Sequence, residues 1–132
     1  MAICEFARYC ATSLDAIVSI ENPDRSYLWL LDPYLELIEE GWTETRFSPC
    51  MYGADYPKYT KLLCWRRCPK SMGRLCVRQP STGEFSCGHG PSRPHCVLEG
   101  RRCSAAAEYA DGVVEAWARD VYDWRLGPEA ER

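Results

Sequence analysis

Both histidines and most of the nine cysteines of this 132-residue chain fall within the forty residues from Cys64 to Cys103. Thiolate sulfur and imidazole nitrogen are ligands that zinc prefers, and a segment without a core of its own gains most from a metal. The spacing matches neither paired Cys-x2-Cys knuckles nor the zinc-finger pattern. We predict that this segment could bind zinc; the alternative is a loop with free thiols. The predicted ligands are Cys76, Cys87, His89 and His95, with Cys96 as a substitute.

A carboxylate and an amide, Glu21 and Asn22, follow an apolar run that ends at Ile20. The run is rich in β-branched residues, which predicts a buried strand, and Pro23 is expected to end that strand because it cannot donate to a ladder. Open α/β sheets bind ligands at the carboxyl ends of their strands. The pattern therefore places Glu21 and Asn22 where a ligand could bind; the alternative is a turn that happens to hold an acid.

Charge is unevenly distributed although the net charge is only −3. Residues 1–50 hold nine acids and three bases, residues 51–103 hold three acids and ten bases, and residues 104–132 hold seven acids and three bases. The basic middle could meet phosphate, or it could balance the acidic flanks. The predicted nucleic-acid-binding residues are Lys58, Lys61, Arg66 and Arg67.

A possible nucleophile is Cys50, in the one Pro-Cys pair of the chain. No cofactor-binding loop accompanies it, and the alternative is a buried thiol at the end of a strand.

The pattern of apolar residues predicts an α/β fold with about three strands. We expect a helix over 2–13 with an apolar face that carries Ile3, Phe6, Ala7, Cys10 and Ala11. A second helix is expected over 32–40, together with strands over 16–20, 43–50 and 60–65. Residues 66–102 contain many prolines and glycines and predict an irregular basic insert with at most one helical turn. A closing helix is expected from about Ser104 to Tyr122, with Val113, Ala116 and Val121 on its inward face. The predicted units are 1–65, 66–103 and 104–132, built on a partial doubly wound, mostly parallel sheet.

Other classes of protein are disfavoured by composition. No apolar run is long enough to span a bilayer, and the first residues lack the pattern of a secretory signal. Many cysteines without such a signal favour reduced thiols, so we expect an intracellular protein, nuclear or cytoplasmic.

Three stretches taken together resemble the cytosine-5 DNA methyltransferases. Ile20-Glu21-Asn22 resembles the Glu-Asn motif of that family, and Tyr52-Gly53 followed by 58–63 resembles its Tyr-Gly loop, basic cluster and strand. Residues 107–118 resemble its closing helix, and the insert lies where the family carries its target-recognition region. Pro23 departs from the family, which has Val at that position. The resemblance covers most of the chain but corresponds to the second half of the family's domain.

This resemblance implies a truncated or degenerate target-binding half. Glu21 and Asn22 would be its catalytic residues, with Glu21 holding a flipped cytosine, and basic residues would hold the DNA backbone. The Gly-rich turn for S-adenosylmethionine and the Pro-Pro-Cys loop are absent ahead of Glu21, so the isolated chain is expected to bind no cofactor of this kind and to be inactive unless a missing N-terminal segment supplies them. The alternative is a non-catalytic nucleic-acid- or protein-binding module, which a zinc ion could stabilise.

Overall fold

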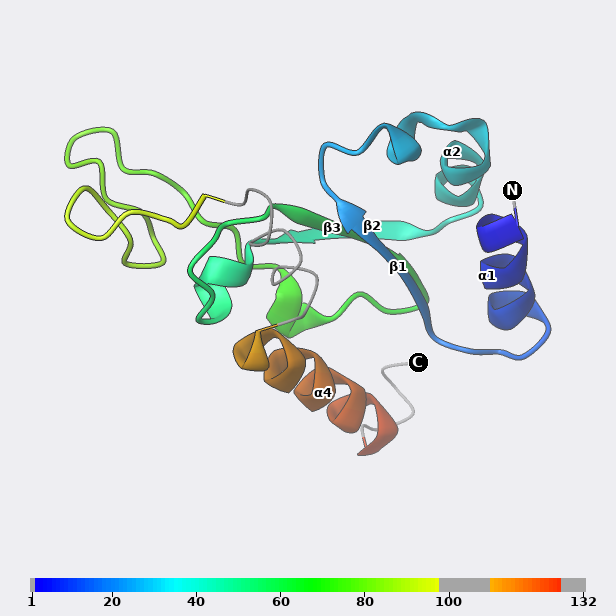
Figure 1. The fold of residues 1–132 in the computed structure, drawn as a ribbon. Coiled ribbons are helices and arrows are strands. Elements are labelled where there is room, and N and C mark those ends of the chain that lie inside the picture. The colour runs from blue at the N-terminus through cyan, green and yellow to red at the C-terminus, as the bar shows by residue number, and fades with distance from the viewer. Residues whose placement is uncertain (1, 98–109, 127–132) are drawn as a thin grey trace.

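The structure is a computed structural model that describes residues 2–97 and 110–126 (Figure 1). Its elements follow one another in the order α1 (Ala2–Thr12), β1 (Val18–Pro23), η1 (Tyr27–Leu30), α2 (Asp32–Glu39), β2 (Thr43–Phe47), η2 (Pro49–Tyr52), β3 (Thr60–Trp65), η3 (Lys70–Met72) and α4 (Asp111–Leu126), where η marks a 3-10 helix. In this part of the chain the fold is mixed α/β, as predicted, with one open sheet and flanking helices.

The sheet of the described residues has the strand order β1-β3-β2, and β3 is antiparallel to both neighbours. The expectation of a mostly parallel sheet is therefore wrong. β1 and β2 do point the same way and are joined through α2, but β3 occupies the position between them. Apolar periodicity locates strands along the chain and does not show which strands become neighbours.

Strand β1 continues through the residues that were expected to follow it. Glu21 lies opposite Leu62 and Asn22 opposite Lys61 in the register with β3, so the predicted end of the strand before Glu21 is wrong. Pro23 is tolerated in the strand because β1 lies at the edge of the sheet, where one side of the backbone needs no ladder partner.

Helices cover both faces of the sheet: α1 and α2 lie on one face and α4 lies on the other (Figure 1). The central strand β3 is buried along almost its whole length, and its side chains alternate between the two layers. Leu63 packs with Trp29, Tyr34 and Leu37 in the α1–α2 layer. Leu62 and Cys64 pack with Phe47, Met72 and Val113 in the α4 layer.

Helix α1 was predicted correctly in its bounds, but its buried face was predicted only in part. Cys4, Ala7 and Ala11 face the core, whereas Ile3 and Phe6 are exposed. Short side chains let the helix approach the large aromatic residues of that layer closely, and bulky residues on the same face would hold it away.

Helix α4 packs through Val113 and Ala116, as the periodicity predicts, while the predicted inward residue Val121 is half exposed. The buried position belongs to Asp120, whose carboxylate accepts hydrogen bonds from the Ser71 amide at 2.9 Å and from the Ser71 hydroxyl at 2.7 Å. These bonds fasten α4 to η3. The predicted beginning of this helix, residues 104–109, lies outside the described residues.

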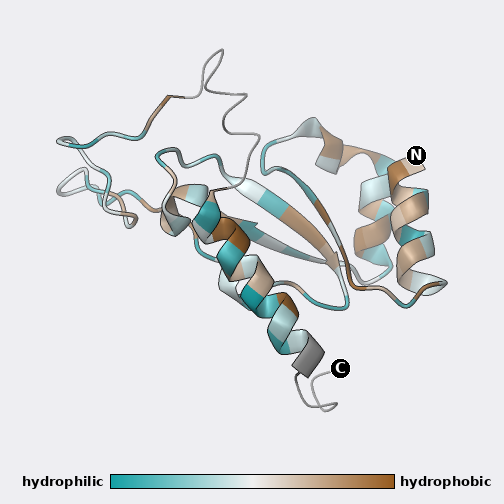
Figure 2. Ribbon diagram, turned by 60° about the horizontal axis from the view of Figure 1, so that its bottom comes forward, coloured by the Kyte–Doolittle hydropathy of each residue, from teal (hydrophilic) through white to brown (hydrophobic). Residues whose placement is uncertain are grey.

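Residues 66–97 form the irregular insert, and η3 is its single helical turn within the described residues. Figure 2 shows that most of its ribbon is hydrophilic or neutral in hydropathy. Leu75, Val77 and Val97 are all exposed there. Met72, near the start of the insert, is buried in the α4 layer, but hydrophobic burial contributes little to holding the part that follows it.

Candidate metal centre

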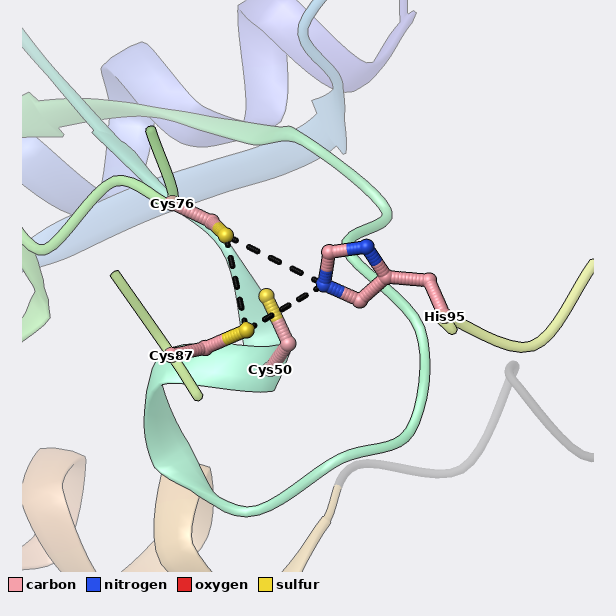
Figure 3. A group of neighbouring side chains, drawn as sticks. All are labelled: Cys50, Cys76, Cys87 and His95. Carbon is pink, nitrogen blue, oxygen red and sulfur yellow. Dashed lines mark hydrogen bonds between the residues drawn. The ribbon is translucent and has the colours of Figure 1, made fainter. Parts of the chain in front are cut away.

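Four side chains converge where the insert meets the segment after β2 (Figure 3). Cys50 comes from η2, and Cys76, Cys87 and His95 come from the insert. One ligand atom from each residue, Sγ or an imidazole nitrogen, lies within 4.8 Å of the others. Cys50 and Cys76 are buried, and the other two are half-buried. This Cys3His group could hold a metal ion.

The interatomic distances show thiols that are close but not bonded to one another. Cys76 Sγ lies 3.5 Å from Cys87 Sγ, far beyond the S–S bond length of about 2.05 Å. The nitrogen Nε2 of His95 lies 3.2 Å from Cys87 Sγ and 3.9 Å from Cys76 Sγ. The arrangement is that of atoms facing a common centre.

Ser48 joins the two segments that supply the first two cysteines. Its backbone amide donates to the Arg74 carbonyl at 2.9 Å, and its hydroxyl accepts from the Cys76 amide at 2.9 Å. The Tyr59 hydroxyl donates to the Cys76 carbonyl at 2.8 Å. Cys76 is therefore held by two residues outside the insert, Ser48 and Tyr59, and Ser48 is itself fully buried.

Tight turns bring the other two side chains of the group, Cys87 and His95, back to the same place. The Ser86 amide donates to the Val77 carbonyl at 3.0 Å, and the Phe85 amide donates to the His89 carbonyl at 2.8 Å. Gly88 has φ 96°, a left-handed conformation that glycine adopts without strain, and it reverses the chain directly after Cys87.

The segment that carries His95 is tied to the loop after η2. The Cys96 amide donates to the Asp55 carbonyl at 2.6 Å, which fixes the backbone directly after His95. The His95 ring also meets the edge of Phe85, with ring centroids 4.5 Å apart.

His89 was predicted as a ligand, and the structure places it beside the group instead. Its Nδ1 lies 3.1 Å from Cys87 Sγ, and its ring stacks on His95 with centroids 4.6 Å apart. Its Nε2 points to Asp55 Oδ1 at 3.7 Å. The substitute Cys96 is not in the group either, because its sulfur contacts the Val97 carbonyl.

Cys50 is the member of this group that sequence reasoning did not assign to a metal. It lies well before the Cys- and His-rich segment, and its Pro-Cys context suggested a nucleophile or a buried thiol. Burial, together with hydrogen bonding to Cys76 and Cys87, raises the pKa of the Cys50 thiol well above its ordinary value. A nucleophilic thiolate needs the opposite shift, so this environment does not activate Cys50 by itself.

The environment of Cys87 has the opposite effect. Burial raises the pKa of its thiol, but hydrogen bonds from the His89 backbone and from the rings of His89 and His95 outweigh burial and lower the pKa to about 6. The thiolate is the form that binds metals, so this cysteine is prepared for that role.

The predicted nucleic-acid-binding residues are separated by the fold. Lys61 is buried in the central strand, where its ammonium binds Glu44 at 3.2 Å and lies 5.0 Å over the Trp29 ring. Lys58 is half-buried in the loop before β3. Arg66 and Arg67 lie at the end of β3, and both line surface cavities.

Glu21 and Asn22 lie inside an edge strand and not at the end of a parallel one. The Asn22 amide donates to Ser26 Oγ at 3.2 Å, and Ser26 in turn caps η1 by accepting from the Leu28 amide. The argument from the carboxyl ends of parallel strands does not apply to this antiparallel sheet.

No protein-family model, curated protein or solved structure matches this chain. The resemblance to cytosine-5 DNA methyltransferases, with its implied DNA and S-adenosylmethionine, therefore stays a prediction. Among the described residues, no helix combines the length and the apolar character needed to cross a bilayer.

Proposed function

We propose that this chain is a non-catalytic nucleic-acid-binding module whose basic insert is held by a structural zinc ion. The observation that carries the proposal is the convergence of Cys50, Cys76, Cys87 and His95. Three thiols and one imidazole are a ligand set of structural zinc sites.

The distances support a tetrahedral centre. Zn–S bonds of about 2.3 Å and Zn–N bonds of about 2.0–2.1 Å place neighbouring sulfurs about 3.8 Å apart and sulfur about 3.6 Å from nitrogen. The measured separations are 3.5 Å between Cys76 and Cys87, and 3.2 and 3.9 Å from these sulfurs to His95. Each of these three lies within about 0.4 Å of a tetrahedral edge. The Cys50 sulfur lies within 4.8 Å of the other three atoms.

A structural role follows from the number of protein ligands. Catalytic zinc sites keep one position open for water or substrate, whereas structural sites fill all four with side chains. Here four side chains surround the centre. The insert also needs such an ion, because its larger apolar residues are mostly exposed, while structural zinc supplies about 10–16 kcal/mol in small zinc-binding peptides.

The charge of the insert supports a nucleic acid as its partner. Residues 66–97 carry six bases and one acid, and the insert projects from the three-layered core (Figure 1). A basic segment of fixed shape attracts phosphates through counterion release, and a metal that orders it lowers the entropy lost on binding.

Elemental analysis of the purified chain tests the metal. We expect one zinc per chain in the native protein and in Cys96→Ser, and loss of zinc in Cys87→Ser. The two substitutions make the same chemical change in the same segment, but only Cys87 belongs to the group. Absence of zinc, or a disulfide between Cys76 and Cys87 detected as a mass lower by two hydrogens, would contradict the proposal.

A further inference from the structure

Two adjoining cavities lie where β3 ends, and neither contains a residue of the Cys3His group. They measure about 360 and 250 Å³ and share Arg66, Arg67 and Trp124 as lining residues. Together they are of the size that accommodates a small ligand or one unit of a polymer.

The lining of these cavities is strongly basic. Lys70 joins the two arginines in one cavity, and Asp15 is the acid of the other. Arg66 binds Asp15 Oδ1 at 2.8 Å, and the carboxylate side chain of Asp15 is 82% exposed. A phosphate group can therefore compete with this exposed carboxylate for the guanidinium. The planar guanidinium binds carboxylates and phosphates alike through two parallel N–H···O bonds.

The backbone holds the two ion-paired residues in uncommon conformations. Arg66 has φ 69° and Asp15 has φ 51°, and they are the two non-glycine residues with positive φ in the described chain. Arg66 also donates to the Asp15 carbonyl at 3.2 Å, so it joins the end of β3 to the segment that precedes β1. The left-handed conformation directs the Arg66 side chain toward this site at a cost of about 1–2 kcal/mol.

Trp124 supplies a flat apolar wall to both cavities. It lies near the end of α4 and is half-buried, and the Arg67 guanidinium lies 5.9 Å over its ring. A guanidinium beside an indole forms a platform on which an unpaired base can stack while its phosphate meets the neighbouring cations.

We propose that these cavities bind single-stranded nucleic acid, with a phosphate held by Arg66 and Lys70 and a base packed on Trp124. The proposal rests on the proposed function, because it names the form of nucleic acid that the module takes. A duplex offers its phosphates but keeps its base faces stacked inside, so it cannot use the indole.

The experiment measures binding of a fluorescein-labelled twelve-nucleotide oligothymidylate to the full chain by anisotropy. Loss of one stacked base predicts affinity about 5- to 150-fold weaker for Trp124→Ala, and retention of most affinity in Trp124→Phe. Lys70→Ala should reduce the slope of log affinity against log salt by about 0.7. Arg78→Ala, which removes one exposed charge elsewhere in the insert, is the matched control and should leave the Trp124 dependence unchanged.

Equal affinities for Trp124→Ala, Trp124→Phe and the native chain would overturn the proposal, as would tighter binding of a twelve-base-pair duplex. Zinc content is measured on the same samples. If Trp124-dependent binding is found without zinc, the metal assignment fails and this inference stands; if zinc is stoichiometric but Trp124 has no effect, this inference alone fails.

Discussion

Replacement of Cys50 by serine provides the sharpest test of the metal centre, because this residue ties η2 to the insert. At free zinc 100 times above the dissociation constant, binding stabilises the native chain by about 2.7 kcal/mol. Removing a ligand should weaken zinc by at least the 100-fold seen for lost supporting contacts. The zinc stabilisation of Cys50→Ser then falls to about 0.4 kcal/mol at the same free zinc.

The difference of about 2.3 kcal/mol corresponds to a melting temperature about 9 °C lower than that of the native chain for a domain of this size. Thermal unfolding in zinc-buffered solution measures it, and repeating the scan with chelator separates the metal effect from any loss of packing by the serine. Cys96→Ser is the control, since its sulfur lies outside the group, and it should keep the full response to zinc.

Cobalt substitution distinguishes the ligand set in the structure from the set predicted by sequence. The group in the structure offers three cysteine sulfurs, whereas Cys76, Cys87, His89 and His95 would offer two. Cys50→Ser should lower the sulfur-to-cobalt charge-transfer band by about a third. An unchanged band and an unchanged zinc response in Cys50→Ser, with both lost in His89→Ala, would refute the structural reasoning.

Three further predictions concern the core and one thiol. Glu44→Ala should cost about 1–3 kcal/mol by leaving the buried ammonium of Lys61 without its carboxylate, while Lys61→Met should cost less than about 1 kcal/mol; urea unfolding measures both, and equal costs would contradict the argument. Gly112→Ala should destabilise the fold by about 3 kcal/mol or more in the same assay, since its Cβ would collide with the backbone carbonyl oxygen of Tyr52 in η2; native-like stability would show that α4 can shift freely. A hydrogen bond from Cys64 lowers the pKa of the Cys68 thiol, burial opposes it, and a hydrogen bond from Thr43 adds to it, so that the pKa is about 6. The alkylation rate of Cys68, followed by peptide mass spectrometry, should therefore rise with pH through about 6, and Cys64→Ala should move that midpoint upward.

Much of the local structure could be predicted because it depends on neighbours in the chain. The bounds of α1, the capping of η1 by Ser26 and the central strand β3 follow from periodicity and capping chemistry. The irregular insert follows from its prolines and glycines. Three members of the metal group, Cys76, Cys87 and His95, were predictable because one short segment carries them all.

The remaining features depend on which distant segments meet. The register with β3 extends β1 through Glu21 and Asn22, and the central position of β3 buries Lys61 instead of exposing it to phosphate. Periodicity is a property of one segment and contains no information on its partner, so the antiparallel order could not be derived from it.

The metal group shows most clearly which features the sequence determined and which the tertiary structure decided. The sequence by itself determined that a segment poor in apolar residues would carry thiols and imidazoles and would need something other than a hydrophobic core to order it. Only the tertiary structure decided that Cys50 completes the group and that His89 supports it from beside Cys87. The reason is geometric, because membership of the group depends on distances through space and not on spacing along the chain. The hydrogen bonds of Ser48 bring η2 and the insert together across a long stretch of chain.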